Sequence, residues 1–137
     1  MGGTIRQTVL KITMYLLDTN VVIDFCNDKL PVNAANFIES IEPKISVVTA
    51  IELFSFAAIS QTEKQKLQEF TTIATVYDKI DMDIRTQTIA IRQTYKIKLP
   101  DAIIAATAIA YSLTLITRNV NDFKNIQGLS LVNPWEL

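Results

Sequence analysis

A chain of 137 residues, 49% of them hydrophobic, is long enough for one domain with a substantial core and too apolar to be a disordered tail. Its net charge of −1 gives no global field that attracts nucleic acid, so RNA or DNA binding would need a local patch. The sequence has no histidine and a single cysteine, Cys26, which excludes Ser-His-Asp and Cys-His catalysis, histidine-liganded zinc and a disulfide framework. Chemistry must therefore use carboxylates, hydroxyls, lysine, arginine or a hard metal.

The first residues differ from the rest of the chain. Residues 1–13, "MGGTIRQTVLKIT", contain two of the three glycines and have no long apolar segment or cleavage site of a signal peptide. We interpret them as an N-terminal extension, in which Thr8–Thr13 adds to a sheet edge, and residues 14–137 as the domain. No apolar run reaches the ~20 residues of a membrane span, so we expect a cytoplasmic protein without membrane association.

From residue 14 onwards, the sequence alternates predicted strands and helices. In chain order, it predicts a strand at 15–17, helices at 21–27 and 33–41, a strand at 45–48, helices at 49–60 and 62–74, a strand at 75–77, helices at 82–96 and 100–112, and strands at 113–117 and 129–132. The helix at 62–74 is more polar than the others and is expected to face outward. Short apolar strands between helices predict an α/β fold, a single domain with a short parallel sheet of about four to five strands covered by helices on both faces.

Four acidic residues occupy similar places in this pattern. Asp18 follows the first strand, Glu52 lies just after the second, Asp101 opens the alanine-rich helix, and Asp122 follows the strand at 113–117. The carboxyl ends of parallel strands lie at one edge of a sheet, where open α/β folds bind their ligands. The four carboxylates are therefore expected to converge there.

Helix capping is the alternative explanation for each acid. Asp18 suits an N-cap, Thr49 and Glu52 fit a capping box, Asp101 suits a first turn, and Asp122 fits a turn. However, two bare carboxylates ~4 Å apart repel by roughly 4 kcal/mol at an effective dielectric of about 20. A chain that needed only caps would avoid this cost with Ser, Thr or Asn. An all-oxygen acidic cluster suits Mg²⁺ or Mn²⁺.

The motifs that contain these acids resemble those of a known family. "LLDTNVVID", "SVVTAIELF", "LPDAIIAATAIA" and "LITRNVNDF", with the tail "LVNPW", are similar to PIN-domain ribonucleases, specifically VapC-type toxins of toxin–antitoxin pairs. The resemblance covers essentially all of 14–137. It implies a PIN-like fold with metal ligands at Asp18, Glu52, Asp101 and Asp122. It also implies that Thr117 and Asn119 orient a carboxylate or the phosphate. Asn119 is an alternative to Asp122 as the fourth inward group.

The activity that the resemblance implies is that of an Mg²⁺- or Mn²⁺-dependent endoribonuclease, in which metal-activated water cleaves RNA phosphodiesters. The implied partners are an RNA substrate, a cognate antitoxin and a second copy in a homodimer. Apolar residues on the early helices are candidates for the antitoxin contact, although core packing explains most of them equally well: Phe25, Phe37, Leu53, Phe54 and Phe56.

Basic residues at 85, 92, 96 and 98 are candidates for RNA phosphate contacts, although a solvated helix face is the more common meaning of such a stripe. Arg118 is a separate candidate for the RNA backbone, and a solvated surface arginine explains it equally well. Two other functions stay open. One is a non-catalytic PIN-like RNA-binding or scaffold protein. The other is a carboxylate-based phosphatase of the haloacid-dehalogenase type, although Asn20 stands where such an enzyme needs a second Asp.

Overall fold

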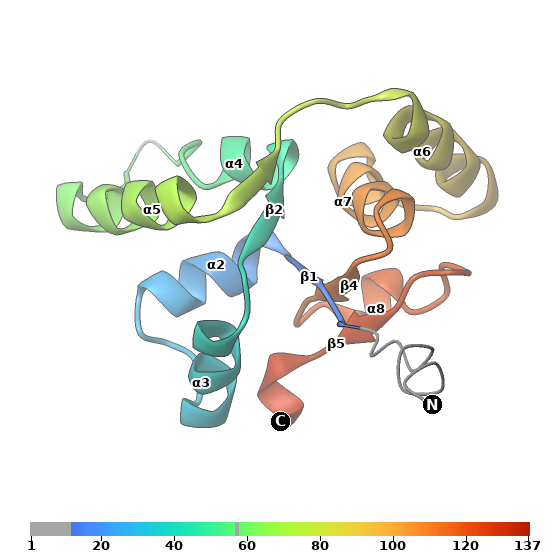
Figure 1. The fold of residues 1–137 in the computed structure, drawn as a ribbon. Coiled ribbons are helices and arrows are strands. Elements are labelled where there is room, and N and C mark those ends of the chain that lie inside the picture. Colours follow the sequence, from blue (N-terminus) through green and yellow to red (C-terminus); the bar gives the residue numbers. More distant parts are fainter. Residues whose placement is uncertain (1–11, 57) are drawn as a thin grey trace, which may run out of the picture.

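The computed structural model describes residues 12–56 and 58–137. Its strands are β1 (Tyr15–Leu17), β2 (Lys44–Ser46), β3 (Thr75–Tyr77), β4 (Thr114–Ile116) and β5 (Leu131–Val132) (Figure 1). Its helices are α2 (Thr19–Cys26), α3 (Val32–Ser40), α4 (Val47–Glu52), α5 (Gln61–Ile73), α6 (Met82–Thr94), α7 (Leu99–Ala110), α8 (Val120–Phe123) and the 3-10 helix η1 (Pro134–Glu136). Residues 8–11 of the predicted edge segment lie outside the described residues, and residues 12 and 13 form no strand.

The strands are short and parallel, which confirms the predicted α/β fold. One sheet has the order β1-β4-β5, and β2 pairs with β3. Because β1 also lies against β2, the five strands follow one another as β3-β2-β1-β4-β5. Backbone bonding continues just past two strand ends, since Asp18 N donates to Ile116 O at 2.9 Å and Thr117 N donates to Val132 O at 3.0 Å.

Helices cover both faces of this strand layer. Successive side chains of a strand point to opposite faces, and β1 and β4 pair in register with Leu16 opposite Leu115 and Leu17 opposite Ile116. The first pair packs with buried residues of α6 and α7, and the second pair packs with those of α2, α3 and α5. Figure 1 shows these two groups of helices on opposite sides of β1. The alternation of apolar side chains therefore builds two cores separated by one layer of strands.

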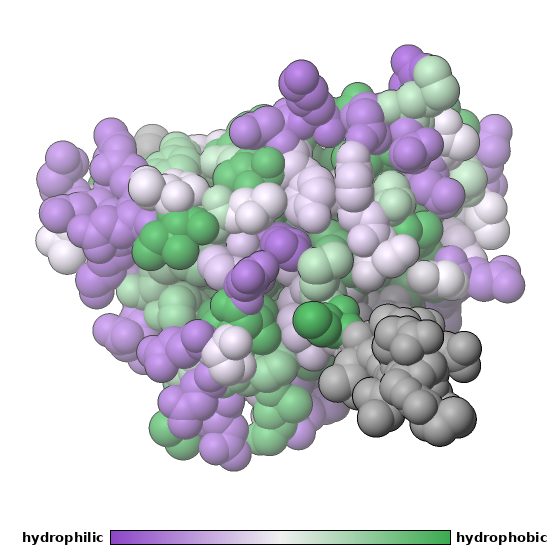
Figure 2. Space-filling view, viewed as in Figure 1, coloured by the Kyte–Doolittle hydropathy of each residue, from purple (hydrophilic) through white to green (hydrophobic). Residues whose placement is uncertain are grey.

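The helices differ in how much of their surface the cores bury. In α7, mostly alanine and isoleucine, six of twelve residues are buried, because small side chains let the helix approach the strands closely. In α5 the buried residue is Leu67. Figure 2 shows mainly hydrophilic side chains over α5, as expected for the polar, outward helix predicted at 62–74. No helix of the described residues has the length and hydropathy needed to cross a membrane.

The boundary between β2 and α4 differs from the prediction. The sequence predicts a strand to residue 48 and a helix over 49–60, but β2 ends at Ser46 and α4 covers Val47–Glu52. The Ser46 hydroxyl accepts a hydrogen bond from Thr49 N at 3.2 Å and so caps α4. This cap outweighs the β-propensity of the two valines that follow, because satisfying an end amide contributes about 1 kcal/mol.

Candidate metal centre

Asp18 stands where β1 ends and α2 begins, and both of its carboxylate oxygens are occupied. Oδ1 accepts a hydrogen bond from Thr19 N at 2.9 Å, which makes Asp18 the N-cap of α2. Oδ2 accepts one from Thr117 Oγ1 at 2.8 Å. Asp18 is 5% exposed and Thr117, directly after β4, is fully buried. The capping interpretation of Asp18 is therefore correct for one oxygen, while the other is bound by a residue from the neighbouring strand.

Glu52 is tied to α2 rather than to the start of its own helix. Its Oε1 accepts a hydrogen bond from Thr19 Oγ1 at 2.7 Å, and Thr19 Oγ1 also lies 3.0 Å from Thr49 Oγ1. The capping box proposed for Thr49 and Glu52 is wrong, because Ser46 is the cap and Glu52 is the last residue of α4. The Thr19 hydroxyl instead holds Glu52 beside the residue that follows Asp18.

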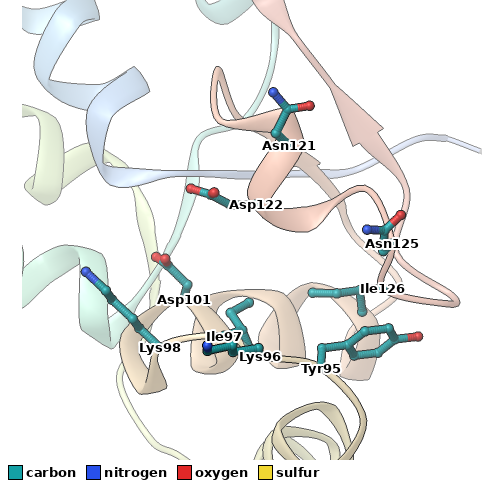
Figure 3. Close-up of a pocket in the computed structure, with 9 residues that line it drawn as sticks. All are labelled: Tyr95, Lys96, Ile97, Lys98, Asp101, Asn121, Asp122, Asn125 and Ile126. Atoms are coloured by element: carbon teal, nitrogen blue, oxygen red, sulfur yellow. The ribbon is translucent and has the colours of Figure 1, made fainter.

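Asp101 and Asp122 line one cavity of about 510 Å³. Asp101 lies in the first turn of α7 and Asp122 in the first turn of α8. In Figure 3 their carboxylates project into the same space from opposite sides. Asn119 does not line this cavity; it lines a neighbouring hollow, which Asp122 also lines, and its backbone N donates to Thr117 Oγ1 at 3.0 Å. Of the two candidates for the fourth inward group, Asp122 is the one that faces Asp101.

The charges of the four acids affect the pKa values of Asp18 and Asp101. Burial is the main cause that raises the pKa of Asp18, and the charges of Glu52 and Asp122 raise it further, while the bonds from Thr117 and Thr19 lower it. Burial also raises the pKa of Asp101, followed by the charges of Asp18, Glu52 and Asp122, against a small lowering by Lys98. Each carboxylate therefore adds to a shared negative potential, which a bound cation would relieve.

The donor chemistry fits a hard divalent ion, but the side chains do not form a closed shell. Across 12–56 and 58–137, no three acidic, histidine or cysteine side chains stand close enough to enclose a metal as they are. Mg²⁺ typically keeps several waters and is bound through one or two carboxylates. The four acids thus suit a partly hydrated Mg²⁺ or Mn²⁺, with some carboxylates acting through water.

Cationic groups flank the acids, and several of them were singled out from the sequence. Lys96 and Lys98 line the same cavity as Asp101, and Arg118 lies over the Trp135 ring, 4.6 Å from its centroid. Arg92 Nε instead donates a hydrogen bond to Ile97 O at 3.4 Å.

Burial raises the pKa of Cys26 to about 11, so its thiol is protonated at neutral pH.

Sequence reasoning missed the remaining polar lining of the cavity. Asn121 and Asn125 line it from α8 and the turn that follows, and Tyr95 lines it from the end of α6. The four-residue helix α8 carries too short a pattern to be predicted. The asparagine-rich stretch "RNVNDFKN" was the available signal that polar side chains lie beside Asp122.

Comparisons with known proteins agree with this architecture. The PIN domain family model matches residues 15–129. The chain is similar to a protein in the solved structure described as a toxin–antitoxin complex from Klebsiella pneumoniae, with 36% identity, a TM-score of 0.72, and coverage of 90% of this chain and 99% of the other.

Two further structures are similar at 25% identity. VapBC2 from Rickettsia felis, bound to a DNA fragment from their promoter, gives a TM-score of 0.75 with coverage of 88% of this chain and 98% of the other. DNA-bound VapBC from Salmonella typhimurium gives 0.74 with coverage of 90% and 99%. No curated protein matches the chain.

Proposed function

Since this chain belongs to the PIN-domain family, we propose that it is a VapC-type toxin that cleaves RNA at a divalent metal centre formed by Asp18, Glu52, Asp101 and Asp122. The observation that carries the proposal is the placement of the acids: Asp101 and Asp122 project into one cavity, while hydrogen bonds from Thr117 and Thr19 hold Asp18 and Glu52 beyond the ends of β1 and β2. Helix caps alone give no reason to bring carboxylates together, because the carboxylates repel one another. A site that binds a divalent cation needs such a cluster of negative charge.

In the proposed reaction, the chain's own groups position the reactants. A bound Mg²⁺ or Mn²⁺ supplies Lewis acidity, which activates water and offsets the phosphate charge. Thr117 holds Asp18 in one orientation, and Thr19 does the same for Glu52. Asp101 and Asp122 line the cavity where the water would attack, so a carboxylate of this pair can take up the proton that the water loses. Bond formation from water to phosphorus and breakage of the bond to the 3′ oxygen leave a 5′-phosphate and a 3′-hydroxyl.

The proposed partner is an antitoxin, because the similar structures are described as toxin–antitoxin or VapBC complexes. Exposed apolar side chains support a contact beside α2, where a cavity of about 370 Å³ is lined by Ile23 and Phe56. Phe56 is 61% exposed, whereas Leu53 is fully buried and belongs to the core. We also propose that the chain forms a homodimer and acts in the cytoplasm.

The phosphatase alternative finds less support. Asn20, which occupies the position of its second Asp, is exposed and lines the cavity beside α2 with Ile23 and Phe56. That cavity is not the one lined by Asp101 and Asp122. Asn20 is therefore not among the residues that share a cavity with Asp101 and Asp122.

Two experiments test the proposal. Purified chain is incubated with an RNA pool in Mn²⁺ and in excess EDTA, and cleavage is expected only with the metal. Cleavage that persists in EDTA would overturn the metal centre, and no cleavage in either condition would overturn the nuclease assignment. The chain is also expressed with and without the gene that neighbours it. Growth arrest is expected only without that gene, and unimpaired growth with abundant intact chain would contradict the toxin role but not the fold.

A further inference from the structure

The cavity beside Asp101 is lined by several residues that metal binding does not need. Tyr95, Ile97 and Ile126 supply the apolar part of its lining, beside two lysines and two asparagines. The Tyr95 hydroxyl accepts a hydrogen bond from Gln127 N at 3.0 Å, which fixes the ring against the turn after α8. In Figure 3, Tyr95, Ile126 and Asn125 lie together at the end of the cavity away from Asp101. An aromatic ring with a carboxamide near it is suited to a nucleobase.

Charge at the rim favours a phosphate-bearing ligand. Lys96 and Lys98 line the cavity and are exposed, and the ion pair found within the described residues involves neither of them. Their ammonium groups are therefore free to meet phosphates that flank a bound base. The volume of about 510 Å³ lies within the usual range of ligand pockets, about 300–1,000 Å³, and accommodates one nucleotide.

We propose that this cavity holds an unpaired nucleotide next to the cleaved phosphate of the RNA, and that Asn125 reads the edge of its base. The inference rests on the proposed nuclease function, because Asp101 and Asp122 then mark the position of that phosphate. The base must be unpaired, since a cavity between α7 and the α8 turn admits a splayed base and not a duplex. Asn125, rather than Asn121, is the reader because Asn125 lies beside Tyr95 and Ile126 in Figure 3, whereas Asn121 lies apart from them.

The test measures base preference rather than total activity. An RNA library randomised around the cut is digested in Mn²⁺, and the bases flanking the cut are counted. A carboxamide that binds a base edge with two hydrogen bonds gives about 5- to 150-fold discrimination between bases. Asn125→Ala should reduce this preference toward unity at one flanking position, whereas Asn36→Ala, a substitution of an exposed asparagine on α3, should leave it unchanged.

A binding measurement separates this inference from the proposed function. Fluorescent tetranucleotides that vary at one position are titrated, by anisotropy, against Asp101→Asn and the double variant Asp101→Asn, Asn125→Ala. The first should prefer one base and the second should not. If the wild type cleaves RNA but its flanking preference survives Asn125→Ala, the inference is wrong and the nuclease function stands. If Asn125-dependent base preference appears in binding while the wild type does not cleave, the nuclease function is wrong. Absence of both binding and cleavage overturns both.

Discussion

The Thr117 hydroxyl donates a hydrogen bond to Asp18, so removing that hydroxyl is a quantitative test of the candidate metal centre. Thr117→Val keeps the shape of the side chain but removes the donor to Asp18 Oδ2 and the acceptor of Asn119 N. A hydrogen bond to a charged group contributes about 1.5–3 kcal/mol and a neutral one about 0.5–1.5 kcal/mol. Because Thr117 is fully buried and Asp18 nearly so, water cannot replace the lost partner. We expect a loss of about 2–4 kcal/mol in the free energy of unfolding at pH 7.

The loss should depend on pH in a defined direction. The bond from Thr117 lowers the pKa of Asp18, whereas burial raises the net value above 3.8, so removing the bond raises the pKa further. A group whose pKa is higher in the folded chain than in the unfolded chain contributes most stability below the unfolded value and loses it as the pH rises through the folded value. The destabilisation by Thr117→Val should therefore be largest at neutral pH and shrink toward pH 3.8.

Urea denaturation at pH 7 and pH 4 measures both effects, and a double-mutant cycle with Asp18→Asn assigns them to the pair. The cost of Thr117→Val should fall by about 1–2 kcal/mol in the Asp18→Asn background, because an amide loses less than a carboxylate when its partner is removed. Thr86→Val, at an exposed position on α6, is the control and should stay within about 0.5 kcal/mol of wild type. A Thr117→Val loss below about 0.5 kcal/mol, or strict additivity in the cycle, would refute the reasoning.

Three other predictions follow from the same structure. In metal-free buffer, Asp101→Asn should raise the melting temperature at pH 7, because burial and the neighbouring acids raise the pKa of Asp101 and so disfavour its charged form. The gain should vanish below pH 3.8, where the carboxyl group is protonated in the folded and the unfolded chain. A lower melting temperature at pH 7 would contradict the repulsion. Mn²⁺ at a hundred times its dissociation constant should stabilise the wild type by about 2.7 kcal/mol and Asp18→Asn much less, as measured by thermal denaturation. Ile104→Ala in the buried face of α7 should cost about 2–5 kcal/mol in urea denaturation, whereas Ile89→Ala, 52% exposed on α6, should cost far less; equal costs would contradict the core assignment.

Local patterns predicted most of the fold. Leu16 and Leu17 lie in a short apolar run between polar residues, and such runs identify strands without tertiary information. The alternation of these two residues between opposite cores follows from the period of a strand. The boundary at Ser46 was missed because two local signals compete there: the valines after the serine favour a strand, whereas Ser46 caps a helix by accepting a hydrogen bond from Thr49 N.

The candidate site was predicted as a set of residues but not as a set of contacts. The position of Asp18 after a strand and that of Asp101 at the start of the alanine-rich helix are visible in the sequence. However, the partner of Asp18 Oδ2 is Thr117, 99 residues away, and the partner of Glu52 is Thr19, 33 residues away. Such pairs depend on the order of the strands, which no local pattern contains. The capping box of Glu52 failed for this reason, since a local partner was assumed where a distant one is bound.

The most direct test of the metal centre compares capping with catalysis. Asn and Gln retain a side-chain oxygen for capping but lack the charge that a hard metal needs. The rate of cleavage of one RNA in Mn²⁺ is measured for the wild type, Asp18→Asn, Glu52→Gln and Asp101→Asn, with Asp24→Asn on α2 as the matched control. The three site variants should lose at least about 100-fold, because metal-based stabilisation contributes several kcal/mol, and the control should cleave like wild type. If Asp18→Asn cleaves RNA at the wild-type rate, Asp18 is only a helix cap and the proposed centre does not exist.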